Sequence, residues 1–185
     1  MSDWFKTTEG TLKRVWDTLA LGVADAAHPA RRPTFATISP SGWPEARTVV
    51  LRGVDPTVGT VTVHTDLYSD KIKSLQASSR AALHIWDADQ DLQIRVQTEV
   101  TIQSGDAVSA LWHKIPDHAQ QSYGVTPPPG APIETALEYV KQPDPTTFAV
   151  LICDVVHIDA VHLGADHRRA SFSRVRHWQG QWLSP

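Results

Sequence analysis

The stretch EARTVVLRGVDPTVGTVTVHTDLYSDK, from Glu45 to Lys71, is where the fold and the candidate chemistry of this chain meet. Two segments rich in β-branched residues, 46–54 and 60–65, predict strands. The DPTVG between them supplies turn residues, so the two strands are expected to be adjacent and antiparallel. From Tyr68 to residue 78 the apolar residues have helical spacing, which predicts a helix there.

Polar residues along this stretch suggest a ligand that carries phosphate. Thr65, Ser69 and Lys71 lie between a strand end and a helix start, where free N–H groups and the helix dipole favour an anion. An ordinary helix cap with a solvated lysine is the alternative. Arg47 and Arg52 are five residues apart on one predicted strand and should therefore point to opposite faces. Two exposed strand arginines are the alternative there.

The rest of the chain predicts a single domain over residues 1–185, built mainly from strands. We expect six or seven strands with short turns, forming a closed antiparallel barrel. Further strands are predicted at 34–39, 81–87, 92–103, 147–163 (one strand or two) and, as a hairpin, 169–183; helices are predicted at 8–27, 106–119 with a break at Pro116, and 134–140. The proline-rich segment 125–132 is expected on the surface, where it could cover a site.

Composition excludes several classes of protein. A net charge of −3 disfavours binding nucleic acid through bulk positive charge. The single cysteine, Cys153, lies in an apolar run and is expected to be a buried thiol. The sequence has no apolar run of the roughly 18 residues that a membrane span needs, and residues 1–10 lack the pattern of a signal peptide. We therefore expect a cytoplasmic protein.

Nine histidines raise the question of a metal site. His157, His162 and His167 are five residues apart, a spacing that suits neither a helix face nor a strand face, and no HExxH or CxxC pattern occurs. We expect no metal.

Five short motifs in register resemble the pyridoxamine 5′-phosphate oxidase-like, FMN-binding split-barrel family. They extend over about residues 34–103, and the end of the chain, HRRASF followed by WQGQWLSP, is also similar to the family's closing strands. The motifs are Arg47-Thr-Val-Val-Leu51-Arg52, His64-Thr65, Ser69-Asp70-Lys71, Ala82-Leu83-His84-Ile85-Trp86 and Gln93-Ile94-Arg95-Val96.

The resemblance implies a split β-barrel that forms a homodimer with two FMN molecules at the subunit interface. Arg47 and Lys71 would hold the FMN phosphate with help from Thr65 and Ser69, and Gln93 would hydrogen-bond the isoalloxazine ring. The full set of residues implied at FMN is Arg47, Thr48, Val49, Val50, Leu51, Arg52, His64, Thr65, Ser69, Asp70, Lys71, Gln93, Arg168 and Arg169.

Three positions depart from the family pattern near the cofactor. Asp70 replaces an arginine that is usual at the phosphate, Arg52 replaces a lysine, and His64 replaces an aromatic residue. Arg168 or Arg169 is the candidate to supply the missing arginine.

The substrate side departs further. Where pyridoxamine phosphate oxidases carry Tyr, Arg and Ser to grip the substrate phosphate, this chain has Leu111, Ile115 and Ala119. These side chains offer a phosphate no donors. The resemblance therefore implies an FMN-dependent oxidoreductase with another substrate. The alternatives are a genuine pyridoxamine or pyridoxine phosphate oxidase, and a non-catalytic module that binds flavin, haem or a deazaflavin.

Overall fold

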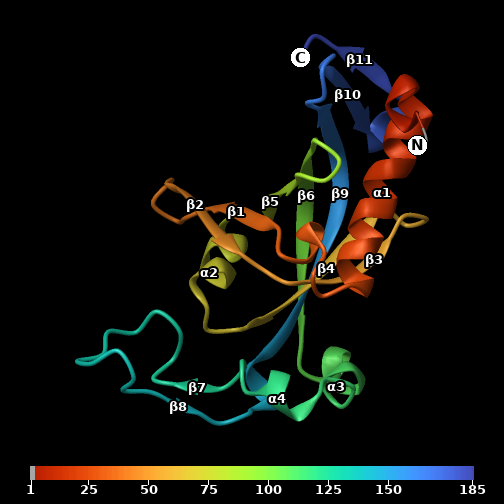
Figure 1. The fold of residues 1–185 in the computed structure, drawn as a ribbon. Coiled ribbons are helices and arrows are strands. Elements are labelled where there is room, and N and C mark those ends of the chain that lie inside the picture. The colour runs from red at the N-terminus through yellow and green to blue at the C-terminus, as the bar shows by residue number, and fades with distance from the viewer. Residues whose placement is uncertain (1–2) are drawn as a thin grey trace.

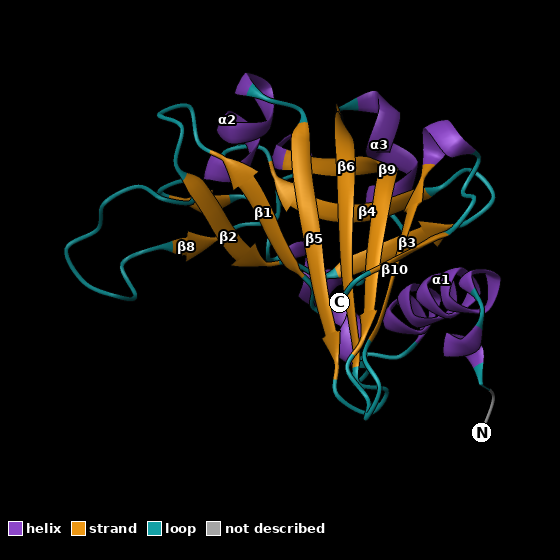
Figure 2. Cartoon of the chain, turned by 90° about the horizontal axis from the view of Figure 1, so that it is seen from above, coloured by secondary structure: helices purple, strands orange, loops and turns teal. Residues whose placement is uncertain are grey.

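Strand β9 (Phe148–His162) joins the two halves of the sheet in the computed structural model, which describes residues 3–185. One edge of β9 pairs with β6 (Leu92–Ser104) along almost its whole length. The other edge pairs with β4 (Thr60–Asp66) up to Asp154 and with β10 (Arg168–Ser173) from His157 onward. The sheet therefore splits at the middle of β9, as Figures 1 and 2 show.

The remaining strands close this split sheet around a core. They are β1 (Thr34–Ile38), β2 (Pro44–Thr48), β3 (Leu51–Asp55), β5 (Arg80–Asp87) and β11 (Gln181–Leu183). The order is β11-β10-β9-β6-β5-β1-β2, and β3 pairs with β4 on the far side of β9. Val49 and Val50 carry the chain from β2 at one edge to β3 at the other, and the Val49 N–H donates to the Pro33 carbonyl at 3.1 Å.

Alternating side chains explain why the barrel has a packed interior. Leu92, Ile94 and Val96 of β6 are buried while the residues between them are more exposed, as the alternation of apolar residues predicts. Helix α1 (Thr8–Ala24) lies against the barrel beside β3 and buries Val15 and Leu19 (Figure 1).

Short elements and a long arm complete the chain. They are the helices α2 (Asp70–Ala77), α3 (Asp106–Trp112) and α4 (Asp117–Gln120), the 3-10 helices η1 (Trp4–Lys6), η2 (Pro29–Arg31), η3 (Pro145–Thr147) and η4 (Arg174–Arg176), and the two-residue strands β7 (Val125–Thr126) and β8 (Val140–Lys141). Strands β7 and β8 pair at the base of an arm that projects from the barrel (Figure 1). None of the helices within residues 3–185 has the length and apolar character needed to cross a bilayer.

Two sequence predictions need correction. The segment 46–54 is two strands rather than one, so the main sheet has nine strands instead of six or seven. The helix predicted at 134–140 is absent: the chain there turns and enters β8. Leu137, which would have anchored that helix, is 81% exposed, so no packing surface stabilises it.

Candidate functional site

A cavity of about 310 Å³ opens where β2, β3, β4 and the start of α2 meet. Its lining contains nine of the fourteen residues that the sequence placed at a cofactor. These are Arg47, Thr48, Val49, Val50, Arg52, His64, Thr65, Ser69 and Lys71. The cavity is therefore the candidate anion site, and its geometry depends on the break at Val49 and Val50. Because Arg47 lies on β2 and Arg52 on β3, the expectation that they point to opposite faces of one strand was wrong.

Hydroxyl groups and an ammonium group converge at the end of β4. The Lys71 Nζ donates to Thr65 Oγ1 at 2.9 Å, and Ser69 Oγ lies 3.1 Å from the same oxygen. Ser69 is the N-cap residue of α2, but its hydroxyl makes no capping bond and instead donates to the Asp66 carbonyl at 2.7 Å. Thr65 and Ser69 are both buried. The alternative of an ordinary serine cap with a solvated lysine does not describe this geometry.

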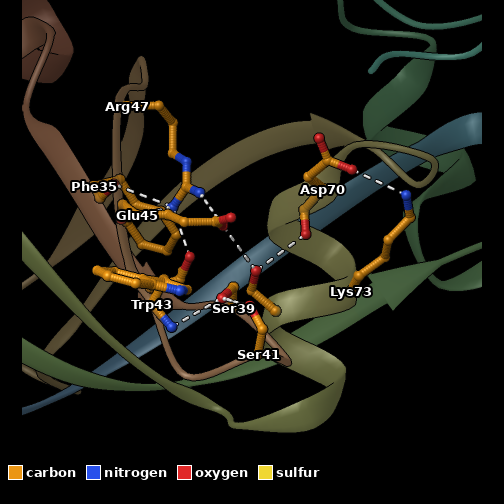
Figure 3. A network of polar contacts seen from close by, with 10 residues as sticks. Phe35, Ser39, Ser41, Trp43, Glu45, Arg47, Asp70 and Lys73 are labelled. Atoms are coloured by element: carbon orange, nitrogen blue, oxygen red, sulfur yellow. Dashed lines mark hydrogen bonds and ion pairs between the residues drawn. The ribbon is translucent and has the colours of Figure 1, made fainter. Parts of the chain in front are cut away.

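Arg47 is held at the cavity by contacts on its far side. Its guanidinium donates to Glu45 Oε2 at 2.9 Å and to Thr37 Oγ1 at 2.6 Å. Glu45 also accepts from Ser74 of α2 at 3.2 Å, so the contacts connect β2 to the helix (Figure 3). This bracing fixes the position of the Arg47 charge before any ligand arrives.

The charge balance of the cavity favours an anion. Burial lowers the pKa of Lys71, and the neighbouring Arg47 lowers it further, whereas Asp66 and Asp70 act in the opposite direction. Within residues 3–185, no carboxylate lies within ion-pair distance of the Lys71 ammonium. A phosphate placed between Lys71 and Arg47 would offset both the desolvation and the repulsion. The two cations and two hydroxyls present therefore fit a phosphate group.

An aromatic wall faces this polar end. His64 and Tyr123 both pack edge-on against Phe148, with ring centroids 5.1 Å and 5.0 Å away. Burial lowers the pKa of His64 to about 4, and the charge of Arg52 adds to the effect, so the imidazole is neutral at neutral pH. Burial also raises the pKa of Tyr123, which nearby Arg52 partly opposes. This wall offers apolar surface beside a cation.

Two predicted residues belong to the same elements but do not line the cavity. The Leu51 side chain is fully buried in the barrel core. Asp70 points outward and pairs with Lys73 at 2.9 Å, with both side chains more than half exposed (Figure 3). The negative charge of Asp70 is therefore directed away from the lysine and hydroxyls.

The other three predicted residues lie at the opposite end of the sheet. Gln93 of β6 and Arg169 of β10 both pair with Val161 of β9, one on each edge of that strand. Arg168 of β10 pairs with the next residue of β9, His162. Thr65 pairs with Ala149 at the beginning of β9, so up to roughly 40 Å of strand separates the two groups. Arg169 donates three hydrogen bonds to Asp159, of 3.3 Å, 3.1 Å and 2.8 Å. Within one chain, Gln93, Arg168 and Arg169 therefore do not reach the cavity.

Four lining residues were not among the predicted site residues: Asp66, Ser122, Tyr123 and Pro129. The last three come from the segment around the proline-rich loop, which the sequence had suggested as a cover. For Asp66, the only signal in the sequence was its position directly after Thr65. Of the histidines considered as metal ligands, none belongs to a metal-binding group: residues 3–185 contain no cluster of three or more suitable side chains.

Comparison with known proteins agrees with the fold and with FMN as the cofactor. The family model described as pyridoxamine 5′-phosphate oxidase, FMN-binding domain, matches residues 13–104, which include the β2–α2 part of the cavity. The cofactor prediction, FMN, is confirmed by that match.

Similarity to a curated relative covers a limited region. A stretch of 67 residues is 43% identical to a pyridoxine/pyridoxamine 5′-phosphate oxidase of Microcystis aeruginosa (strain NIES-843 / IAM M-2473). It covers 36% of this chain and 30% of that protein, so the match spans less than a third of the relative.

Solved structures confirm the split-barrel fold class. A pyridoxamine 5′-phosphate oxidase-related, FMN-binding protein from Nostoc punctiforme PCC 73102 aligns with a TM-score of 0.76 and 24% identity over 100% of this chain and 99% of its own. PhzG from Burkholderia lata 383, in complex with tetrahydrophenazine-1-carboxylic acid, aligns with a TM-score of 0.75 and 16% identity over 100% of this chain and 98% of its own.

Proposed function

Because residues 13–104 belong to the pyridoxamine 5′-phosphate oxidase family of FMN-binding domains, we propose that this protein is an FMN-dependent oxidoreductase with a substrate other than pyridoxamine phosphate. The observation that carries the proposal is the convergence of Arg47, Thr65, Ser69 and Lys71 on one cavity. These residues would hold the FMN phosphate. The flavin supplies the redox chemistry when bound, and the protein binds it, orients it and tunes it.

The aromatic wall gives the rest of the cofactor a place to lie. Val49 and Val50 pass along the cavity between the two arginines, so the flavin ring would extend from the phosphate end toward Arg52 and His64. A neutral His64 adds no second cation beside Arg52. The positive charge of Arg52 would therefore be the main electrostatic influence of β3 on the flavin.

The proposed assembly is a homodimer whose two chains each complete the other's site. Gln93, Arg168 and Arg169 share one end of the sheet and lie too far along β9 to reach the cavity of their own chain. A second copy, placed with this end against the cavity, would bring them to the flavin. This arrangement accounts for both groups of predicted residues with a single type of site.

The residues aligned with the substrate-phosphate grip argue against pyridoxamine phosphate as substrate. Leu111 and Ile115 pack against a small core formed by Val108, Trp112, Tyr123, Phe148 and Val150. They are part of a hydrophobic cluster and carry no donor for a phosphate dianion, whose burial without donors is costly.

Two measurements test the proposal. Purified protein should absorb near roughly 450 nm, and mass spectrometry should identify its released ligand as FMN. A reduced nicotinamide should bleach the bound flavin, and air should restore its colour. Failure to take up added FMN at micromolar concentration would contradict it. An oxygen-dependent assay for pyridoxal phosphate should give no product, because Leu111 and Ile115 cannot grip the substrate. Product at saturating pyridoxamine phosphate would favour the alternative of a genuine phosphate oxidase, which the Microcystis relative supports.

Bound FMN that no reductant bleaches would instead favour a non-catalytic flavin-binding module. That outcome would leave the cavity assignment intact and remove only the enzymatic part of the proposal.

A further inference from the structure

A segment far along the chain crosses the anion cavity. We call residues 122–130 the strap: it leaves α4, forms β7 and enters the proline-rich loop. Ser122, Tyr123 and Pro129 of the strap line the cavity together with the strand residues of the proposed FMN site. The strap belongs to neither the barrel nor the residues matched by the family model, which end at 104.

Asp66 fastens the strap to the barrel. The residue is 5% exposed, and its two carboxylate oxygens accept backbone N–H bonds from Tyr68 at 2.8 Å and from Gly124 at 2.9 Å. The second bond joins residues 58 positions apart in the chain. Hydrogen bonds to an ionised carboxylate are stronger than neutral ones, so this contact is well suited to hold a loop.

The position of Asp66 is unusual for a structural carboxylate. It follows Thr65 directly and lines the same cavity as Lys71 and Arg47, where a second anion would be repelled. Asp66 is 5% exposed and its carboxylate holds two N–H groups. The negative charge is thus directed to the strap, and within residues 3–185 it forms no ion pair with Lys71.

The path of the strap is fixed at two glycines. Gly124 has φ +93°, and a Cβ there would lie 2.1 Å from the Gln142 carbonyl oxygen. Gly130 has φ +88°, and a Cβ there would lie 2.8 Å from Asp70 Oδ2 at the start of α2. Both positions disfavour other residues. The strap is therefore bonded to the barrel at Asp66 and passes close to Asp70 at the start of α2.

We infer that Asp66 is a positioning residue that holds the strap closed over the anion cavity, so that bound FMN leaves only after the Asp66–Gly124 bond opens. The inference rests on the proposed FMN site. FMN can enter or leave only while this bond is open, so the strap limits both rates. Asp66 would therefore govern the rate of FMN exchange by holding the strap.

The test uses the full-length protein and the variant Asp66→Asn. The asparagine amide has one oxygen acceptor, so it can accept from only one of the Tyr68 and Gly124 N–H groups. Its NH₂ group faces the other N–H, and the strap should therefore open more often. We expect FMN to dissociate about tenfold faster, the size expected for losing one hydrogen bond to a charged group. The association rate should rise by a similar factor, because the same opening admits FMN, and the affinity should change little. Stopped-flow fluorescence of FMN measures both rates.

Trypsin provides a readout independent of FMN fluorescence. Lys141 is the only lysine or arginine between Lys114 and Arg168, and it lies in β8 at the base of the arm. Bound FMN should protect Lys141 from cleavage in the wild type and protect it less in Asp66→Asn. The matched control is Asp144→Asn, because Asp144 also accepts backbone and side-chain bonds near the arm, from Thr146, but does not line the cavity.

A second variant keeps the inference testable if Asp66→Asn fails to fold. Gly130→Ala disturbs the strap at its exposed end, and Gly42→Ala is its control, since Gly42 has φ +89° in a turn with nothing within 4 Å of the added Cβ. We expect faster FMN release in Gly130→Ala and not in Gly42→Ala. Wild-type dissociation and cleavage rates in both strap variants would overturn the inference. A wild-type protein that binds no FMN would instead overturn the proposed function.

Discussion

The two polar groups that the sequence assigned to one ligand lie at opposite ends of β9. The group at the cavity has a lysine with no carboxylate at ion-pair distance within residues 3–185, together with buried hydroxyls. In the distal group, the buried carboxylate of Asp159 already binds Arg169 at 2.8 Å and Arg95 at 2.9 Å. The cavity thus keeps one cation, Lys71, without a carboxylate partner within residues 3–185, although its Arg47 pairs with Glu45 at 2.9 Å. In the distal group, Arg169 is held by a buried carboxylate. From this difference we propose that the distal group assists a site that the cavity defines.

The largest effect is expected from removing both cavity cations. Arg47→Ala combined with Lys71→Ala should weaken FMN binding about a thousandfold, since each removes a charge-assisted phosphate contact. Isothermal titration with FMN measures it. Lys73→Ala is the matched control, because Lys73 lies two residues further along α2 and pairs with Asp70 on the exposed surface. Wild-type affinity in the double variant would show that the phosphate lies elsewhere.

A mixed dimer tests whether the distal group completes the partner's site. Gln93→Ala with Arg169→Ala should lower FMN affinity about a hundredfold if these residues reach the partner's flavin. A dimer of one such chain and one Arg47→Ala/Lys71→Ala chain contains one intact site and one doubly defective site. Co-expression with two affinity tags should therefore restore tight binding of one FMN per mixed dimer. Binding as weak as in either parent would rule out a shared site.

The smallest effect concerns acid stability. The pKa of His64 is about 4 in the folded protein against 6.5 for the free side chain, because burial disfavours the charged ring. Between these values the unfolded chain binds the extra proton, so His64 makes the fold lose stability as pH falls from 6.5 toward 4. His64→Phe, which keeps an aromatic edge against Phe148, should flatten this loss in urea titrations, whereas His84→Phe should not. An unchanged pH profile in His64→Phe would contradict the assignment.

The alternation of apolar and polar residues predicted the strands well where one face of the strand is buried. In β6, Leu92, Ile94 and Val96 alternate with exposed residues, and the barrel follows from such strands joined by short turns. The break at Val49 and Val50 was not predictable, because the apolar run continues through it and only the closure of the barrel requires β3 to leave β2. The helix predicted at 134–140 failed for a related reason: its apolar residues have no surface to pack against.

The site was predictable where neighbours in sequence are neighbours in space. Thr65, Ser69 and Lys71 lie within seven residues and meet as expected. Tyr123 and Pro129 reach the cavity only through the path of the strap, which the sequence could suggest as a cover but could not place. The separation of Gln93 from Lys71 follows from the length of β9 and could not be seen from motif order alone.

The phosphate of FMN is proposed to bind in the cavity at the end of β4. The most direct test compares FMN with riboflavin, which carries the same ring without phosphate, on the unmodified protein. We expect FMN to bind at least about a hundredfold more tightly than riboflavin, and this preference to disappear in Arg47→Ala/Lys71→Ala. Equal affinity of the wild type for FMN and riboflavin would contradict it.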